Sequence, residues 1–385
     1  MRHPRAPDGV GVRLAPGSML RCAARFGRDG RARRRQEAKM ADRPGPEALS
    51  RRMLLTAGGA GIAVGAGLVV RNQIRHPHKN KKVTPDGRPR HLTLAAANPG
   101  RDPVLLAARD QGLFDRYKLE IAYAGPVRSG RDALNQIQSG EADAAVAAAL
   151  SWLPRLQGGL PARLVCGLQA GSSRLLVARH SPFHRIEDLH RHVIGITNLD
   201  SPDRLFFSIM MRRKGMDPNR DVEWRQLPAD GLGLALAEGH VQAVVGHDPA
   251  IWMLRDGLHL DELASSMSGS YSVRVSRVLG LRSAVLQADP VAAVALTMAM
   301  QDAARWVGAH PQQTAALLAA ESPAITEEQF DRMLRSEGRA VHPVGNDLRD
   351  QVAEYMDELK LIGLTPESLD STAFARDVTA DTLKA

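Results

Sequence analysis

The hydrophobic and polar positions of residues 91–246 form a pattern that occurs twice. Each copy contains three apolar runs of strand length, separated by two helical stretches, and the second copy follows the first by about one hundred residues. Strands that alternate with helices in this way are typical of βαβ units with a parallel sheet. The expected strands are residues 92–97, 119–124 and 143–148 in the first copy, and 193–197, 222–227 and 242–246 in the second.

The helix ends are marked in the same way in both copies. Asp102-Pro103 and Ser201-Pro202 each place an N-cap residue before a proline at the first helical position. Any α/β chain shows some helix–glycine–strand punctuation, but here the landmarks keep their order and spacing. The pattern therefore predicts two similar α/β lobes. The glycines expected at helix C-termini are Gly112, Gly140, Gly215 and Gly239.

The segments between and after the copies predict a hinge. The apolar runs 162–170 and 175–178 flank Gly171-Ser172-Ser173, and the β-rich run 272–281 leads back. We expect lobe 1 to comprise residues 91–178 and 275–385, and lobe 2 to comprise residues 179–274. The remaining sequence predicts helices over residues 289–308, 311–320, 326–336 and 347–362, with a capping box at Thr326.

The first 90 residues differ from the rest in charge. They contain 21 of the 51 Lys and Arg residues and 6 of the 42 Asp and Glu residues, whereas residues 91–385 contain 30 and 36. The body is therefore mildly acidic, which argues against a nucleic-acid partner, because such a protein needs a basic face.

Ser50-Arg51-Arg52 and the uncharged run 53–70 that follows resemble a twin-arginine export signal. A marginal membrane helix is the alternative, since about 18 apolar residues is the lower limit for spanning a bilayer. Residues 40–75 are thus expected to be a signal or a membrane anchor, with residues 76–90 as a basic linker. We expect Met40 to be the initiator and residues 1–39 to be untranslated or disordered.

Ligands of open parallel sheets bind beyond the carboxyl ends of the strands. Helix N-termini in these loops offer free N–H groups and a partial positive charge, which suit an anion. The candidate ligand-binding residues are those in the loops and beside the hinge: Asn98, Arg101, Arg128, Ser129, Ser151, Trp152, Ser172, Asn198, Ser201, His247 and Asp248.

Several of these candidates also have a purely structural interpretation. Arg101 and Arg128 either pair with a carboxylate, sulfonate or nitrate or remain solvated on the surface. Ser201 is interpreted first as an N-cap. Trp152 either stacks on a ligand or packs in the core. The pair His247-Asp248 either reaches a ligand or forms a structural turn.

The sequence contains no motif for catalysis or for metal binding. It lacks a nucleophile elbow, a zinc-protease motif and a P-loop, and its 13 histidines are scattered. Cys22 and Cys166 cannot form a disulfide framework or a zinc cluster, and Cys166 is expected to be buried. We therefore expect no metal, no catalytic residues and no cofactor. For an enzyme, Cys166 and His247 are the only candidates.

Four segments resemble the nitrate/sulfonate/taurine class of ABC solute-binding proteins. They are residues 103–124 with Gln-Gly-Leu-Phe-Asp at 111–115, residues 138–146, residues 186–196, and residues 237–249 ending in His247-Asp248-Pro249. The resemblance covers about residues 91–310. It implies an α/β fold that is periplasmic-binding-protein-like (type II), with two βαβ lobes and a two-crossing hinge.

The resemblance also implies a function. Such a protein captures a small, usually anionic solute in the periplasm and delivers it to an ABC permease in the inner membrane, commonly as a monomer without cofactors. Nitrate, a sulfonate, bicarbonate, an aromatic acid and a pyrimidine precursor are all compatible. The loops at 98–102 and 198–202 match no substrate pattern, and Asp200, Asp203 and Asp248 weaken the expectation of a pure anion site. The alternative is an enzyme on the same fold, of the desulfinase-like or the pyrimidine- or menaquinone-pathway type.

Overall fold

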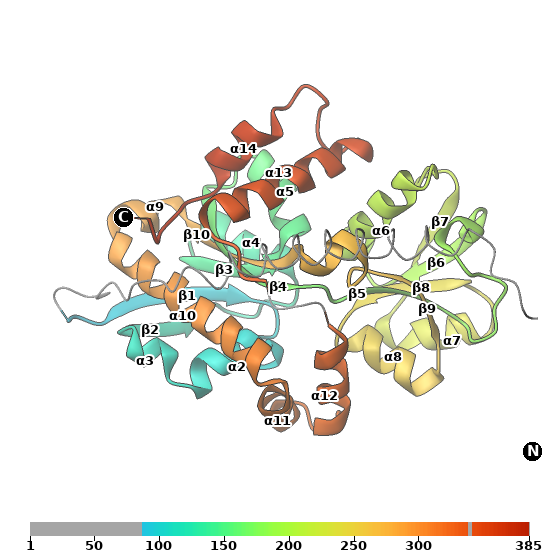
Figure 1. The fold of residues 1–385 in the computed structure, drawn as a ribbon, viewed down its shortest axis with the longest axis horizontal. Coiled ribbons are helices and arrows are strands. Elements are labelled where there is room, and N and C mark those ends of the chain that lie inside the picture. Colours follow the sequence, from blue (N-terminus) through green and yellow to red (C-terminus); the bar gives the residue numbers. More distant parts are fainter. Residues whose placement is uncertain (1–86, 338–340, 385) are drawn as a thin grey trace, which may run out of the picture. The chain divides into compact units, whose positions relative to one another are not determined.

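In the computed structural model, the described residues are 87–337 and 341–384, and they form two α/β lobes (Figure 1). The predicted export signal, the proposed initiator Met40 and most of the basic linker lie outside these ranges. Within the described ranges, no helix combines the length and the hydropathy needed to cross a membrane.

Lobe 1 is built on a five-stranded sheet with the order β2-β1-β3-β10-β4. The strand β1 is parallel to β2 and β3, whereas β10 runs antiparallel to β3 and β4. The parallel part is the βαβαβ unit expected from the first copy of the pattern. The strands of this sheet are β1 (Arg90–Ala96), β2 (Leu119–Tyr123), β3 (Ala144–Ala148), β4 (Ala162–Ala170) and β10 (Val275–Arg282).

Helices cover both faces of this sheet (Figure 1). Apolar side chains of α2 and α10 form one core with the strands, and those of α4, α5 and α13 form another. The four predicted C-terminal helices are confirmed as α10 to α13, and Thr326 and Gln329 form the predicted capping box. The helices of this lobe are η1 (Pro99–Arg101), α2 (Pro103–Asp110), α3 (Leu113–Arg116), α4 (Gly130–Ser139), α5 (Ala149–Gln157), α9 (Ser283–Ala288), α10 (Pro290–Ala309), α11 (Pro311–Glu321), α12 (Glu327–Ser336), α13 (Gly345–Leu361) and α14 (Ser371–Val378).

Lobe 2 repeats this architecture with the strand order β7-β6-β8-β5-β9. The strand β6 is parallel to β7 and β8, and β5 is antiparallel to β8 and β9. Apolar residues of α6 pack on one face of the sheet, and those of α7 and α8 pack on the other. The elements are β5 (Ser173–Val177), η2 (Ile186–Leu189), β6 (His192–Ile196), α6 (Pro202–Arg213), β7 (Val222–Gln226), η3 (Ala229–Gly231), α7 (Leu232–Ala237), β8 (Ala243–His247), α8 (Ala250–Leu258), β9 (Asp261–Ser265) and η4 (Gly269–Val273).

The landmarks of the repeat have the predicted roles in both lobes. The Asp102 carboxylate accepts the N–H groups of the first turn of α2, and the Ser201 hydroxyl accepts the N–H of Arg204 in α6. The four predicted cap glycines have φ values of 58°, 81°, 81° and 74°, in the region that glycine reaches without a Cβ clash. The two-lobe interpretation of the sequence is therefore confirmed.

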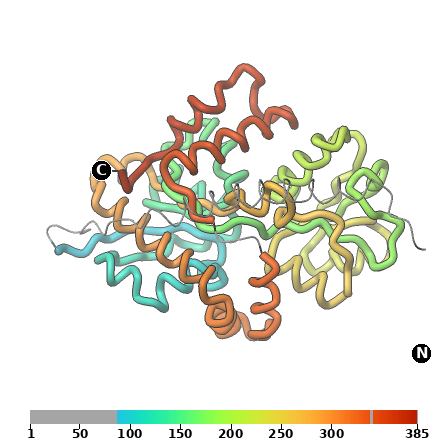
Figure 2. The backbone as a smooth tube through the Cα atoms, in the orientation of Figure 1, coloured from blue at the N-terminus to red at the C-terminus, as the bar shows by residue number. Residues whose placement is uncertain are grey.

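The chain crosses between the sheets twice (Figure 2). The first crossing lies at residues 171–172, between β4 and β5, and the second lies between β9 and β10. The predicted end of the first lobe-1 segment at residue 178 was wrong, because β5 pairs with β8 and β9 of the second sheet. An apolar run has the same appearance at the end of one sheet as at the start of the next, so the sequence did not reveal on which side of the hinge it lies.

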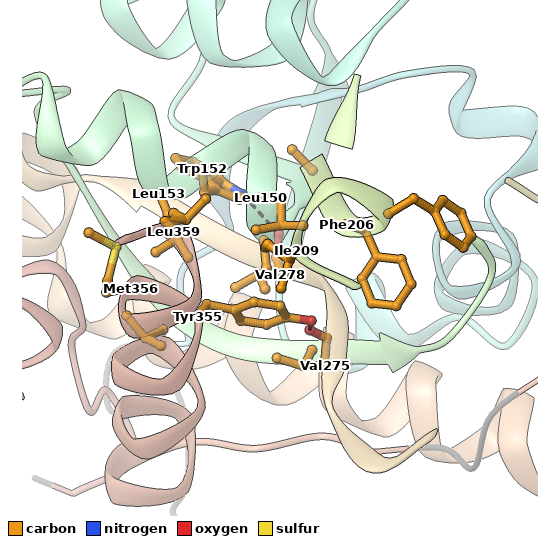
Figure 3. Close-up of a cluster of buried hydrophobic side chains, with 14 of the residues drawn as sticks. Leu150, Trp152, Leu153, Phe206, Ile209, Val275, Val278, Tyr355, Met356 and Leu359 are labelled. Atoms are coloured by element: carbon orange, nitrogen blue, oxygen red, sulfur yellow. Dashed lines mark hydrogen bonds between the residues drawn. The ribbon is translucent and has the colours of Figure 1, made fainter. Parts of the chain in front are cut away.

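Apolar contacts also join the lobes. Phe206 and Ile209 of α6 lie in one core cluster with Trp152 of α5, Val278 of β10 and Tyr355 of α13 (Figure 3). Trp152 is fully buried, and its indole N–H donates to the Val278 carbonyl at 3.2 Å. The expectation that Trp152 contacts a ligand is therefore wrong, and the packing alternative holds. Ser151 and Trp152, which were expected in a loop after the third strand, lie instead in α5, because this helix begins at Ala149.

Candidate functional site

The hinge strands bring polar residues level with the ends of the parallel strands. In lobe 1, Arg277 of β10 lies opposite Ala148, the last residue of β3. In lobe 2, Ser173 of β5 lies opposite His247, the last residue of β8. Because ligands of such sheets bind beyond the carboxyl ends of the strands, these positions are where a site is expected.

Arg174 holds the end of β8 in a buried ionic network. Its guanidinium donates to both carboxylate oxygens of Asp248 at 2.8–3.1 Å, to Glu262 at 2.5 Å and to the Ser336 hydroxyl at 2.9 Å. It also stacks over the ring of Trp252, at 4.8 Å. Asp248 was predicted to bind ligand, but its carboxylate is engaged by Arg174 instead, which makes it a structural residue.

Asp203, at the start of α6, orients His247. Its carboxylate accepts the Ser173 hydroxyl at 2.7 Å and lies 2.8 Å from Nδ1 of His247. Attraction to Asp203 and the hydrogen bond to it raise the pKa of His247. Burial alone would raise the pKa of Asp203, but the charge of His247 and the hydrogen bonds from His247 and Ser173 hold it below its usual range. Each residue of the pair therefore favours the charged form of the other, imidazolium beside carboxylate.

Arg277 faces the same region from lobe 1. Its guanidinium donates to Oδ2 of Asp102, whose other oxygen caps α2 at 2.9 and 3.0 Å from the N–H groups of Val104 and Leu105. The Asp102 side chain is 2% exposed, whereas that of Arg277 is 29% exposed. Both oxygens of the Asp102 carboxylate therefore have partners within the protein. The Arg277 guanidinium still has N–H donors on its exposed side.

Glu337 follows α12 and accepts a hydrogen bond from Gln169 of β4 at 2.7 Å. Burial and the nearby charge of Asp248 raise the pKa of Glu337 to about 8, against the opposing effect of Arg174. Glu337 is therefore largely protonated at pH 7, and it adds little negative charge to the site.

These residues form one group, since the charge of Arg277 acts on both His247 and Glu337, and that of Asp248 acts on the same two residues. We name it the junction cluster. Its exposed donors, on Arg277 and His247, are cationic, and their carboxylate partners are buried. Such an arrangement suits an anionic ligand. The junction cluster consists of Asp102, Gln169, Ser173, Arg174, Asp203, His247, Asp248, Arg277 and Glu337.

The other predicted residues lie in helices, in the loops that precede them or, in the case of Ser172, in the hinge. Ser129 and Ser201 cap α4 and α6. The backbone N–H of Ser172 donates to the Met267 sulfur at 3.1 Å, and its carbonyl accepts the N–H of Asp248 at 2.9 Å. The remaining five are exposed or half-buried: Asn98, Arg101, Arg128, Ser151 and Asn198.

The lobes also meet at one of these loops. Arg131, at the start of α4, forms an ion pair of 2.7 Å with Asp200, in the loop before α6. Both side chains are more than half exposed, so the pair is a weak link that salt would screen.

Four residues of the cluster were not predicted from the sequence: Arg174, Arg277, Gln169 and Glu337. The available signal was a charged residue inside a strand: Arg174 precedes the apolar run 175–177, and Arg277 interrupts β10. Glu337 and Gln169 gave no such signal, because only the packing of α12 against the hinge brings them together.

The structure does not favour a nucleophile or a metal centre. Cys166 is fully buried in β4, and burial raises the pKa of its thiol, which keeps it protonated. In the part of the chain that the structure describes, no group of three or more His, Cys, Asp or Glu side chains could hold a metal ion.

Residues 87–321 match the model of the NMT1-like family, which is more than half of the chain. The chain belongs to the NMT1-like family. A search of proteins with curated functions found no similar sequence. Many solved structures resemble this NMT1-like protein. The three described below are 13–17% identical in sequence, so the similarity shows a shared fold.

Three of the similar structures are binding proteins. The periplasmic aliphatic sulphonate binding protein SsuA of Escherichia coli has a TM-score of 0.63 and 17% identity, over 76% of this chain and 92% of its own. The alkanesulfonate-binding protein SsuA of Xanthomonas axonopodis pv. citri, bound to MOPS, has a TM-score of 0.61 and 17% identity over 74% and 98%. The periplasmic nitrate-binding protein NrtA of Synechocystis PCC 6803 has a TM-score of 0.60 and 13% identity over 76% and 86%. The expected α/β two-lobe fold and the resemblance to the nitrate/sulfonate class are confirmed.

Proposed function

We propose that this NMT1-like protein is the solute-binding component of an ABC importer and that it captures a small anionic solute between its lobes. The observation that carries the proposal is the position of two partly exposed cations, Arg277 from lobe 1 and His247 from lobe 2, at the strand ends of a two-lobe fold. Each has a buried carboxylate partner, so each is fixed in place while its outer donors remain available.

The compatible solutes are nitrate, a sulfonate, bicarbonate and an aromatic acid. Two of the similar structures are described as sulfonate-binding proteins and one as a nitrate-binding protein, which supports this class of ligand. The proposal includes a periplasmic location, delivery to a permease in the inner membrane, and a monomeric protein. Export by the twin-arginine route, with or without retention of a membrane anchor, belongs to the same proposal.

Binding is favoured over catalysis by the hydrogen bonds of the junction cluster. An enzyme of the acyl-transfer type would need a nucleophile activated by His247. Ser173 is the hydroxyl beside this group, but it donates to Asp203 rather than to the imidazole. Cys166 is buried and protonated. These contacts give a fixed cation and no activated nucleophile.

A thermal-shift screen tests the proposal with nitrate, bicarbonate, taurine, an alkanesulfonate and benzoate. A ligand at one hundred times its Kd should stabilise the protein by about 2.7 kcal/mol, which is seen as a higher Tm. A matched screen with Arg277→Gln should lose most of the shift. The absence of a shift with every anion, or conversion of an anion to a product without a permease, would contradict the proposal.

A further inference from the structure

Among the described residues, one ring nitrogen of His247 has a hydrogen-bond partner and the other has none. Nδ1 lies 2.8 Å from Oδ2 of Asp203, and the side chain of His247 is nevertheless 63% exposed. The Asp203 side chain is 5% exposed, and its other oxygen accepts the Ser173 hydroxyl at 2.7 Å. The buried carboxylate thus fixes the ring, and Nε2 is the atom left to contact another molecule.

The charged groups around His247 come from three elements. Asp203 from α6 favours the charged imidazole, as does the neighbouring Asp248, whereas Arg277 from β10 opposes it. Asp248 is already neutralised by Arg174, and Arg277 by Asp102. Asp203 is therefore the carboxylate that pairs with His247 itself, and it has the largest effect on the pKa of the imidazole.

We propose that His247, held by Asp203, donates its Nε2–H to an anionic group of the solute, so that capture of the solute requires a proton on His247. Asp203 is a positioning residue in this arrangement, because it contacts the imidazole and not the solute. The inference rests on the proposed function. It adds that the solute carries a carboxylate, sulfonate or similar oxyanion and that it binds more tightly at acidic than at alkaline pH.

Isothermal titration calorimetry with the full chain tests the inference. Methanesulfonate, nitrate and benzoate are titrated separately between pH 6 and pH 9 at constant ionic strength. Sulfonate buffers are left out because such a compound occupies a similar protein. Loss of a charge-assisted hydrogen bond is expected to raise the Kd about tenfold or more over this range. In His247→Gln the Kd should be higher at pH 6 and should depend on pH less than in the wild-type protein, because only Glu337 of the cluster still titrates in this range.

Glu337→Gln is the matched control, because Glu337 titrates in the same range and lies near the same groups. This variant should lose only the share of the pH dependence that comes from Glu337 and should retain the share that comes from His247. Asp203→Asn should keep the fold but move the midpoint of the dependence to lower pH. Nuclear magnetic resonance of the His247 ring should show the same lowered pKa without any ligand.

The outcomes separate the two proposals. If none of the three anions binds the wild-type protein, and bicarbonate and taurine give no thermal shift either, the proposed capture of an anion fails, and the inference fails with it. If an anion binds and His247→Gln keeps the wild-type dependence on pH, the inference alone is overturned. The same holds if the dependence disappears only in Glu337→Gln.

Discussion

Arg174 and Asp248 form a bidentate ion pair whose side chains are 2% and 1% exposed. Arg174 is on the hinge strand β5, Asp248 directly follows β8, and the Ser336 hydroxyl joins the pair from α12 of lobe 1. The pair therefore fixes the loop that carries His247 and ties it to an element of the other lobe. The junction cluster depends on this contact for its geometry.

The first prediction concerns the removal of this cation. Arg174→Met leaves the buried Asp248 without its ion-pair partner, whereas Glu262 keeps the longer contact to Arg255 at 3.6 Å. Breaking a buried pair in this way costs about 3–5 kcal/mol, because an uncompensated charge remains in the interior. The free energy of unfolding, measured with urea, should fall by that amount. Arg185→Met removes an exposed partner of Asp188 and should leave stability unchanged. Equal stability of the two variants would contradict the account.

The second prediction concerns pH. The pKa of Glu337 is raised to about 8, above the ordinary value of about 4.3. The native protein therefore binds a proton that the unfolded chain releases, and this contribution to stability is lost as the pH rises between the two values. Glu337→Gln mimics the protonated form. It should match the wild type at pH 4 and be more stable at pH 9 in urea unfolding. A constant difference between the two proteins across the pH range would show that Glu337 does not titrate as proposed.

The third prediction concerns the space beside Trp152. A Cβ at Gly280 would lie 2.6 Å from the Trp152 ring, so Gly280→Ala must displace a buried side chain. The expected loss of stability is about 1–3 kcal/mol. Gly257 of α8 has no atom within 4 Å of its Cβ position, and Gly257→Ala should be neutral or stabilise by up to about 1 kcal/mol. The Tm of both variants is measured by thermal unfolding. A lower Tm for Gly280→Ala alone shows overpacking beside Trp152, whereas an equal loss in both variants would show that replacing any glycine with alanine destabilises the protein.

The fourth prediction concerns Glu358 of α13. One oxygen of this carboxylate accepts hydrogen bonds from Arg274 at 2.5 Å, from Arg213 of α6 at 2.6 Å and from Tyr271 at 3.0 Å. Its side chain is 2% exposed. Glu358→Gln should destabilise by about 1–3 kcal/mol, because the buried Arg274 loses a charged acceptor but keeps its ion pair with Glu354 at 2.7 Å.

Arg213→Met is the matched variant for Glu358, since it removes a partner that is 45% exposed, and it should cost less. X-ray scattering should then show a wider range of lobe separations for Glu358→Gln than for Arg213→Met. Through Arg213, Glu358 links α13 of lobe 1 to α6 of lobe 2. A Glu358→Gln protein with wild-type stability and scattering would show that this link does not hold the lobes together.

The sequence was sufficient for the fold where local signals are strong. Asp102, Ser201 and the four cap glycines mark helix ends by local hydrogen bonds and backbone conformation, so they were predictable. The sequence did not predict to which lobe β5 belongs, because its apolar residues could pack in either sheet.

The candidate site was predictable only in part, for a related reason. His247 follows a predicted strand, so its position beyond the strand end could be foreseen. The roles of Arg277 and Glu337 depend on contacts between residues more than 160 positions apart along the chain, Arg277 with Asp102 and Glu337 with Gln169. No local pattern encodes such contacts. The role of Trp152 was not predictable, because an aromatic residue after a strand can either contact a ligand or pack in the core.

The most direct test of the central claim is equilibrium dialysis of the wild-type protein against nitrate, bicarbonate, taurine, an alkanesulfonate and benzoate, with the solutes on both sides quantified by mass spectrometry. The measurement reports binding and chemical fate together. The account predicts that at least one anion is retained at one molecule per chain and is recovered unchanged. Retention of none of them, or recovery of a converted product, would contradict it.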